Sequence, residues 1–123
     1  MKPEEINVHK KSATLELRYP DGVTHTLTAE YLRVSSPSAE VRGHGPDQAV
    51  LQHGKREVQF LNIEPVGYYA LQIVFSDGHD SGIYSWDYLY DLGQNQAHNW
   101  ASYLSELEKA GKSRDPLFIA LGH

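Results

Sequence analysis

The residues best suited to chemistry lie close together near the middle of the sequence. Asp77-Gly78-His79-Asp80-Ser81 is followed within a few positions by Tyr84, Trp86 and Tyr88. Histidine and carboxylate side chains bind metals and transfer protons near neutral pH, while tyrosine and tryptophan dominate the binding energy of protein interfaces. This stretch therefore suggests a metal site or a recognition surface, unless its aromatic rings simply pack a short helix onto a sheet.

The seven histidines of the chain could supply a metal site only if the fold brought them together. Such a site would combine His79 with His44 or His53, with Asp77 as a carboxylate ligand, and it could hold zinc, nickel or iron. The alternative is that each histidine is hydrogen-bonded individually. Cysteine is absent from the sequence, which excludes disulfides, thiolate metal sites and a cysteine nucleophile.

The usual signatures of catalysis are missing. No Gly-x-Ser-x-Gly, His-Glu-x-x-His or His-x-Asp/Glu pattern occurs, so acyl transfer, zinc hydrolysis and facial-triad iron chemistry have no support. Gly111-Lys112-Ser113 resembles the end of a phosphate-binding loop, but it closes a predicted helix instead of opening one. We therefore expect a protein that is not an enzyme and that binds a partner through a polar and aromatic surface. The residues predicted for that surface are Arg42, His44, Asp77, His79, Tyr84 and Trp86.

Two segments that could position these residues resemble each other. Leu15–Leu27 and Leu71–Ile83 each alternate apolar and polar residues up to an Asp-Gly pair, and each leads to a Tyr-Leu dipeptide. Such segments are typical of β-hairpins followed by a short helix. A three-residue turn in each hairpin keeps the apolar residues on one face. It pairs Leu15 with Leu27, Leu17 with His25, Phe75 with His79 and Leu71 with Ile83, and it turns His25, His79 and Ser81 toward the apolar side.

The other elements follow from capping residues and hydrophobic periodicity. We expect short helices over 29–34 and 86–92, the second stopped by Gly93, and a helical turn within 36–43. Strands are predicted at 50–52 and 58–63, a turn at 65–67, and a helix over 94–110 that ends at Gly111. The predicted fold is a β-rich α+β single domain of two pseudo-repeated β-hairpin–short-helix units with a C-terminal helix.

Length and composition limit the class of protein. The 123 residues predict one domain, with a core at about 6–112 and a tail at 113–123. A net charge of −5 disfavours nucleic-acid binding, and the acidic start is unlike a signal peptide. The longest apolar run, 66–75, is too short to cross a membrane, so we expect a cytoplasmic domain that binds neither nucleic acid nor membrane. The apolar segment Leu117–Leu121 would either pack on the domain or bind a partner, which would permit a homodimer.

Three stretches, Tyr31–Gly45, Ile63–Ala70 and Phe75–Leu89, carry a family resemblance. They are similar to bacterial stand-alone members of the domain of unknown function found at the N-terminus of gamma-butyrobetaine hydroxylase. In the hydroxylase, this domain precedes the iron- and 2-oxoglutarate-dependent catalytic domain and binds a structural zinc through three cysteines and the histidine of an Asp-Gly-His sequence. Here His79 matches that histidine, whereas the cysteine region falls at about 36–41, where there is no thiolate.

The resemblance therefore implies that the zinc site is lost, that no cofactor is bound, and that His79 bonds the loop at 35–40 in a structural role. It implies no hydroxylase activity, since the catalytic domain has no counterpart in the sequence. The family is also similar to a domain appended to some Mrp-like ATPases that carry iron–sulfur clusters. That similarity suggests an accessory role in metallocofactor handling, with an unidentified protein such as an iron–sulfur assembly factor as the partner.

Overall fold

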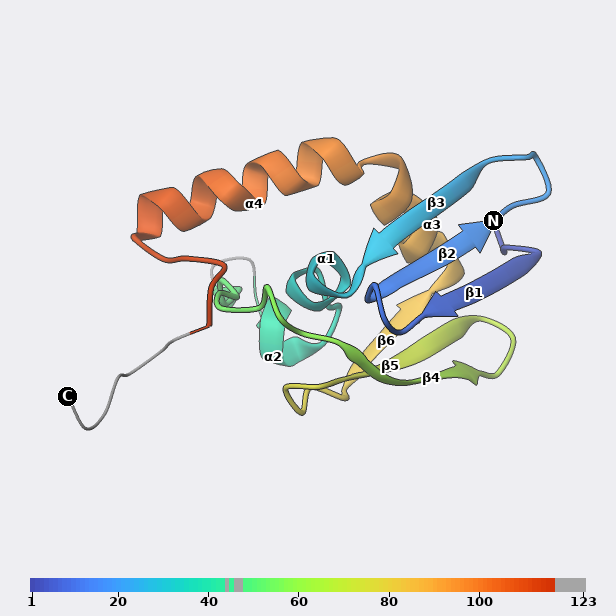
Figure 1. The fold of residues 1–123 in the computed structure, drawn as a ribbon, viewed down its shortest axis with the longest axis horizontal. Coiled ribbons are helices and arrows are strands. Elements are labelled where there is room, and N and C mark those ends of the chain that lie inside the picture. Colours follow the sequence, from blue (N-terminus) through green and yellow to red (C-terminus); the bar gives the residue numbers. More distant parts are fainter. Residues whose placement is uncertain (44, 46–47, 117–123) are drawn as a thin grey trace.

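The computed structural model describes residues 1–43, 45 and 48–116, which form two antiparallel sheets and four helices (Figure 1). One sheet has the order β1-β2-β3 and the other β4-β5-β6. The strands are β1 (Glu5–His9), β2 (Thr14–Arg18), β3 (Thr24–Thr28), β4 (Phe60–Val66), β5 (Ala70–Phe75) and β6 (Gly82–Ser85). The helices are α1 (Ala29–Val34), α2 (Ala39–Arg42), α3 (Trp86–Gln94) and α4 (Gln96–Ala110). His44 and the predicted tail segment Leu117–Leu121 lie outside the described residues.

Each sheet leads directly into a helix, so the two related units expected from the sequence are present. Sheet β1-β2-β3 continues into α1, and sheet β4-β5-β6 continues into α3. Alternate residues of the central strands are buried and meet in one hydrophobic core, as the alternating pattern predicted. The α+β class is confirmed. Each unit, however, has a third strand. The strand β1 was not predicted, because its apolar residues Ile6 and Val8 lie at the sheet edge, 36% and 39% exposed, and form only a short alternating pattern.

A reciprocal pair of hydrogen bonds joins the two units. The Tyr31 hydroxyl in α1 donates to the Leu92 carbonyl in α3 at 2.7 Å, and the Tyr88 hydroxyl in α3 donates to the Ser35 carbonyl after α1 at 2.5 Å. Tyr31 and Tyr88 hold the same position in their units, and each acceptor lies four residues after the tyrosine of its own helix. The bonds therefore follow the internal repeat and satisfy carbonyls that helix ends leave unpaired.

The second hairpin departs from the predicted register, whereas the first has it throughout. The Phe75 amide donates to the His79 carbonyl at 2.9 Å as predicted, but Leu71 pairs with Tyr84 and not with Ile83. One extra residue is therefore accommodated between the two pairs, as in a β-bulge. The shift buries Tyr84 and leaves Ile83 46% exposed, because a one-residue slip exchanges the two faces of a strand and the larger ring fills the core.

Three local predictions are wrong. Residues 50–52 form no strand. β4 continues through Pro65, which an edge strand tolerates because the backbone N–H that proline lacks is not needed there for pairing. The turn comes at residues 67–69, and Gly67 has a φ of 54°. Gly93 lies inside α3 and does not stop it; Asn95 separates α3 from α4.

α4 runs along one side of the molecule, above α1 and α2 in the view of Figure 1. Tyr103 and Leu107 are buried, and the Trp100 ring meets the Tyr31 ring edge-on at 6.2 Å. The left-handed conformation of Gly111 ends the helix as predicted. In the described part of the chain, no helix is long and apolar enough to span a membrane.

Residues 113–116, predicted as part of a tail, are bonded to the fold. The Gly54 amide donates to the Ser113 carbonyl at 2.8 Å, and the Arg56 amide donates to the Arg114 carbonyl at 2.9 Å. The Arg114 side chain makes two hydrogen bonds, at 2.6 and 2.8 Å, to the buried Glu30 carboxylate. The fold therefore extends beyond residue 112.

Candidate functional site

The predicted site residue His79 lies at the centre of a polar cluster between the β5–β6 turn and the segment that follows α1. Its Nε2 lies 2.8 Å from the Ser36 hydroxyl, and its Nδ1 lies 3.1 Å from the Glu40 carboxylate. The Ser38 and Ser81 hydroxyls add a further bond of 2.7 Å between the same two segments. We call this set the His79 cluster: Arg33, Ser36, Ser38, Glu40, Lys55, Asp77, His79 and Ser81.

Asp77 supplies the anionic part of the His79 cluster. Its carboxylate accepts hydrogen bonds from Arg33 at 2.9 Å and from Lys55 at 2.6 Å. It also accepts a hydrogen bond from the His79 backbone amide at 3.3 Å. Burial alone would raise the pKa of the Asp77 carboxyl, but the Lys55 hydrogen bond and the Arg33 charge hold that pKa below its ordinary value. Asp77 therefore stays ionised and joins α1, the chain before β4 and the β5–β6 turn.

Ser36, His79 and Glu40 have the connectivity of a serine–histidine–acid triad. Burial, and secondarily the Arg33 charge, lower the pKa of His79 against the opposing effect of Glu40, so the ring is neutral at pH 7. Ser36, however, is fully buried. Its hydroxyl also accepts a hydrogen bond from the Ser38 backbone amide at 3.2 Å. A nucleophile without access to solvent cannot reach a substrate, so this arrangement acts as a structural connection.

The His79 cluster does not fit the zinc of the hydroxylase domain. The resemblance places the thiolate ligands at about 36–41, where this chain has serine hydroxyls, which are poor zinc ligands at neutral pH. Both ring nitrogens of His79 already have hydrogen-bond partners within the protein, as the family resemblance implied. Within residues 1–43, 45 and 48–116, no three histidine, aspartate or glutamate side chains are grouped to hold a metal. His53, the alternative ligand, is exposed.

The other predicted surface residues that the structure describes are Tyr84, Trp86 and Arg42, and each has its own contacts. Tyr84 is fully buried, and its hydroxyl donates to the Leu32 carbonyl, so it contributes no accessible surface. The Trp86 indole donates to the Tyr68 carbonyl at 2.6 Å. Arg42 projects from α2, donates to the Tyr88 hydroxyl and stacks on that ring at 5.5 Å. Of the predicted residues that the structure describes, Asp77 and His79 are the two that belong to the His79 cluster.

Two exposed tyrosines were not among the surface residues predicted from the sequence. Tyr68 and Tyr69 in the β4–β5 turn are 89% and 62% exposed. The Gly67 after a β-rich segment was the available signal, but the turn was predicted at 65–67 and therefore ended before both tyrosines.

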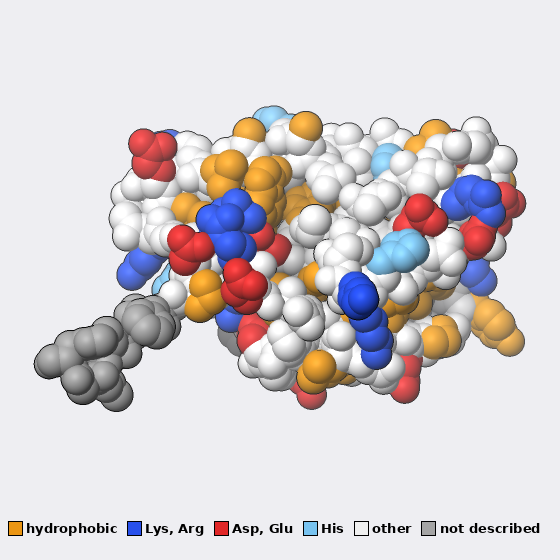
Figure 2. Space-filling view, in the orientation of Figure 1, with side chains coloured by type: hydrophobic (Ala, Val, Ile, Leu, Met, Phe, Trp, Pro, Cys, Tyr) orange, Lys and Arg blue, Asp and Glu red, His pale blue; other side chains and the backbone are white. Residues whose placement is uncertain are grey.

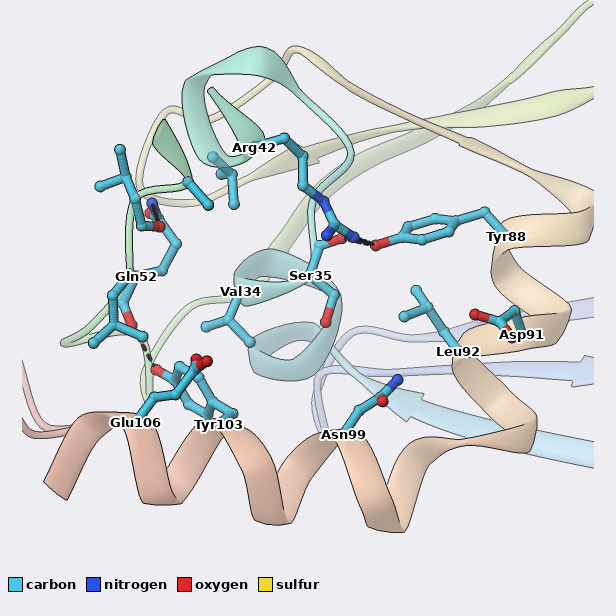
Figure 3. Close-up of a pocket in the computed structure, with 14 residues that line it drawn as sticks. Val34, Ser35, Arg42, Gln52, Tyr88, Asp91, Leu92, Asn99, Tyr103 and Glu106 are labelled. Carbon is cyan, nitrogen blue, oxygen red and sulfur yellow. Dashed lines mark hydrogen bonds between the residues drawn. The ribbon is translucent and has the colours of Figure 1, made fainter. Parts of the chain in front are cut away.

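A cavity of about 540 Å³ lies beside Arg42 (Figure 3) and was not predicted from the sequence. It lies between the end of α1, α2, residues 49–52, α3 and α4. Burial raises the pKa of Tyr103 in its wall to about 12 and also raises the pKa of Tyr88, so both hydroxyls stay protonated. Two stretches distant in sequence, 34–52 and 88–106, form this cavity, which is why no local motif marks it.

The fold and the site together define a small α+β domain with a structural histidine cluster. The chain belongs to the gamma-butyrobetaine hydroxylase-like, N-terminal family, whose model matches residues 6–90; this confirms the resemblance. Two structures solved by NMR in solution are similar to it: one at 52% identity and a TM-score of 0.82 (99% of this chain, 96% of that one), the other at 46% and 0.79 (99% and 91%).

A crystal structure from Acidithiobacillus ferrooxidans ATCC 23270 is a further relative. It is 39% identical with a TM-score of 0.63, and the match covers 75% of this chain and 92% of that one. That protein is described as having unknown function and as belonging to the DUF971 family. Among curated proteins, none matches this sequence.

Proposed function

We propose that this chain is a non-catalytic protein-interaction module that docks through Tyr68, Tyr69 and Trp86, which we call the Tyr68 surface. The observation that carries this proposal is the exposure of two consecutive tyrosines, 89% and 62%. Tyrosine and tryptophan are enriched among the residues that dominate binding energy. Covering a large exposed aromatic ring with a partner lowers the free energy, because apolar surface is removed from water.

The backbone that carries the two tyrosines is held in place before any partner binds. The Trp86 indole donates to the Tyr68 carbonyl at 2.6 Å, and the Trp86 amide donates to the Tyr69 carbonyl at 3.1 Å. The Lys2 ammonium lies 5.7 Å from the centre of the Trp86 ring. A preorganised turn loses little conformational entropy on binding, which favours affinity.

Two further observations support a protein partner and a role without catalysis. The only serine–histidine–acid arrangement among the described residues has its serine buried. On the face seen in Figure 2, acidic and basic side chains are intermixed, and the net charge is −5, whereas nucleic-acid binding needs a basic surface. The similarity of the family to a domain of Mrp-like ATPases makes an iron–sulfur assembly factor the first partner to test.

Site-specific photo-crosslinking tests the proposal. A benzophenone amino acid at position 68, in the native host, is expected to capture a defined protein, and the purified partner is then titrated against the wild-type chain. The double variant Tyr68→Ser/Tyr69→Ser should bind at least about tenfold more weakly. The matched control is Leu104→Ser, which changes another exposed apolar residue, on α4. Equal binding by the double variant and the wild type would show that the Tyr68 surface is not the docking site.

A further inference from the structure

We propose that the cavity beside Arg42 binds a small amphoteric molecule with the chemistry of a free aliphatic amino acid. The cavity measures about 540 Å³, within the range of roughly 300–1,000 Å³ typical of small-molecule sites. Its lining combines apolar side chains with a few charged ones (Figure 3). None of the residues of the Tyr68 surface lines it, so this inference is independent of the proposed function.

Arg42 is the group that would bind a carboxylate. Its guanidinium stacks on the Tyr88 ring at 5.5 Å and donates to the Tyr88 hydroxyl, and that hydroxyl in turn donates to the Ser35 carbonyl. The guanidinium is therefore oriented by neutral groups, and no carboxylate among the described residues forms an ion pair with it. Guanidinium N–H groups that remain available bind carboxylates through paired, charge-assisted hydrogen bonds.

Two carboxylates in the same lining point to a cationic group on the ligand. Asp91 lies on α3, one turn after Tyr88, and Glu106 lies on α4. Figure 3 shows Asp91 on the Tyr88 side of the cavity and Glu106 on the opposite side. A dianion such as phosphate would be repelled by these two charges, whereas a ligand with one carboxylate and one ammonium group complements Arg42 and Asp91 together.

The walls between the charged groups include an apolar part, formed by Val34, Val41, Val50, Leu51 and Leu92. Gln52 and Asn99 add amide groups to the same lining. The Tyr103 hydroxyl, which could otherwise contribute a polar group, donates to the Gln52 carbonyl at 2.8 Å. An aliphatic side chain would therefore find apolar contacts here and would need no further hydrogen bonds.

Titration of the isotope-labelled full chain by NMR tests this inference with leucine as the probe. Saturable shifts are expected in the signals of Val34, Tyr88, Leu92 and Tyr103. The compounds 4-methylpentanoate and 3-methylbutylamine, which lack the amine and the carboxylate respectively, should bind several-fold more weakly. Arg42→Gln should weaken leucine binding by roughly tenfold or more. Arg18→Gln is the matched control, since Arg18 lies on β2 and does not line the cavity.

Each alternative outcome contradicts part or all of the inference. Absence of saturable shifts with leucine would overturn it, as would unchanged leucine binding in a folded Arg42→Gln variant. Equal binding of 4-methylpentanoate and leucine would overturn the assignment of an amphoteric ligand. Tyr88→Phe removes the hydroxyl that orients Arg42 and should give a smaller loss of affinity than Arg42→Gln. This second variant keeps the inference testable if Arg42→Gln does not fold.

Discussion

His79 is buried with both ring nitrogens hydrogen-bonded, and burial lowers its pKa from the ordinary value of 6.5. A histidine with a lower pKa in the folded than in the unfolded state takes up its proton preferentially on unfolding. Its contribution to stability is therefore complete above pH 6.5, the unfolded value, and declines as the pH falls below it. The unfolded chain, with an ordinary histidine, is favoured on the acidic side.

We predict that the free energy of unfolding decreases between about pH 7.5 and about pH 5.5, and that part of this decrease disappears in His79→Gln. Glutamine has no proton to take up in this range. Urea unfolding at both pH values measures the effect. The control His98→Gln replaces an exposed histidine of α4 and should keep the wild-type pH dependence. A His79→Gln variant with the same pH dependence as the wild type would contradict the role assigned to His79.

Asp77 neutralises Arg33, which is 8% exposed in its side chain, and Lys55. We predict that Asp77→Asn lowers the free energy of unfolding by about 1–3 kcal/mol, because it leaves a buried guanidinium without its carboxylate. The Arg33 Nη1 is already buried without a partner in the described part of the chain. The neighbouring Asp80→Asn changes an exposed carboxylate and should have little effect. Chemical denaturation compares the two variants.

At the scale of the elements, two contacts each place a glycine of one unit against a larger residue of the other unit. His25 on β3 faces Gly93 of α3, and the equivalent positions in the other unit are Gly82 on β6 and Ser36 after α1. A Cβ atom at Gly93 would lie 2.4 Å from the His25 ring, and one at Gly82 would lie 2.8 Å from the Ser36 hydroxyl. Each contact therefore pairs a glycine with a larger residue, which lets strand and helix approach closely.

This arrangement predicts an unusual effect of Gly93→Ala. In an ordinary helix interior, alanine for glycine stabilises by roughly 0.5–1 kcal/mol, but here the clash with His25 should make the change destabilising by about 1–3 kcal/mol. In a His25→Ala background the same substitution should become neutral or stabilising. A double-mutant cycle by chemical denaturation measures the coupling. Additive effects of the two substitutions would refute the contact.

Ala13, in the turn between β1 and β2, has a positive φ of 54°. Residues with a Cβ are strained in this conformation, so Ala13→Gly should stabilise the fold by about 0.5–1 kcal/mol. The opposite change, Gly22→Ala, has open space around the new Cβ but a φ of 87°, and it should destabilise by a comparable amount. The melting temperatures of the two variants should therefore move in opposite directions.

At the scale of the whole molecule, residues 113–116 connect the end of the described chain to the loop before β4 and to Glu30. Truncation after Lys112 would leave the Glu30 carboxylate, 7% exposed in its side chain, without Arg114. We predict a loss of about 2–4 kcal/mol for this truncation. Truncation after Pro116 retains those contacts and is the matched control. Equal stability of the two truncated proteins would contradict the contribution of Arg114.

Local patterns were sufficient for most of the fold. The alternation in β2 and β5, the Asp-Gly turns, and the capping by Thr28 and Ser85 depend on near neighbours in the sequence, so they could be predicted. β1 was missed because an edge strand exposes its apolar residues. The register of the second hairpin was wrong because only the core decides whether Tyr84 or Ile83 is buried.

The candidate sites could be predicted only in part. The pairing of His79 with the segment at 35–40 followed from the resemblance of the sequence to its family. The cavity beside Arg42 and the Tyr68 surface did not, since both depend on which side chains remain accessible after packing.

The sequence by itself determined the repeated units, the family and the absence of thiolate ligands, because these follow from residue types and short-range order. Only the tertiary structure decided that Ser36 is buried, that Tyr68 is exposed and that Arg42 faces a cavity. The physical reason is that burial and access result from contacts between segments far apart in the sequence, and those contacts are set by packing.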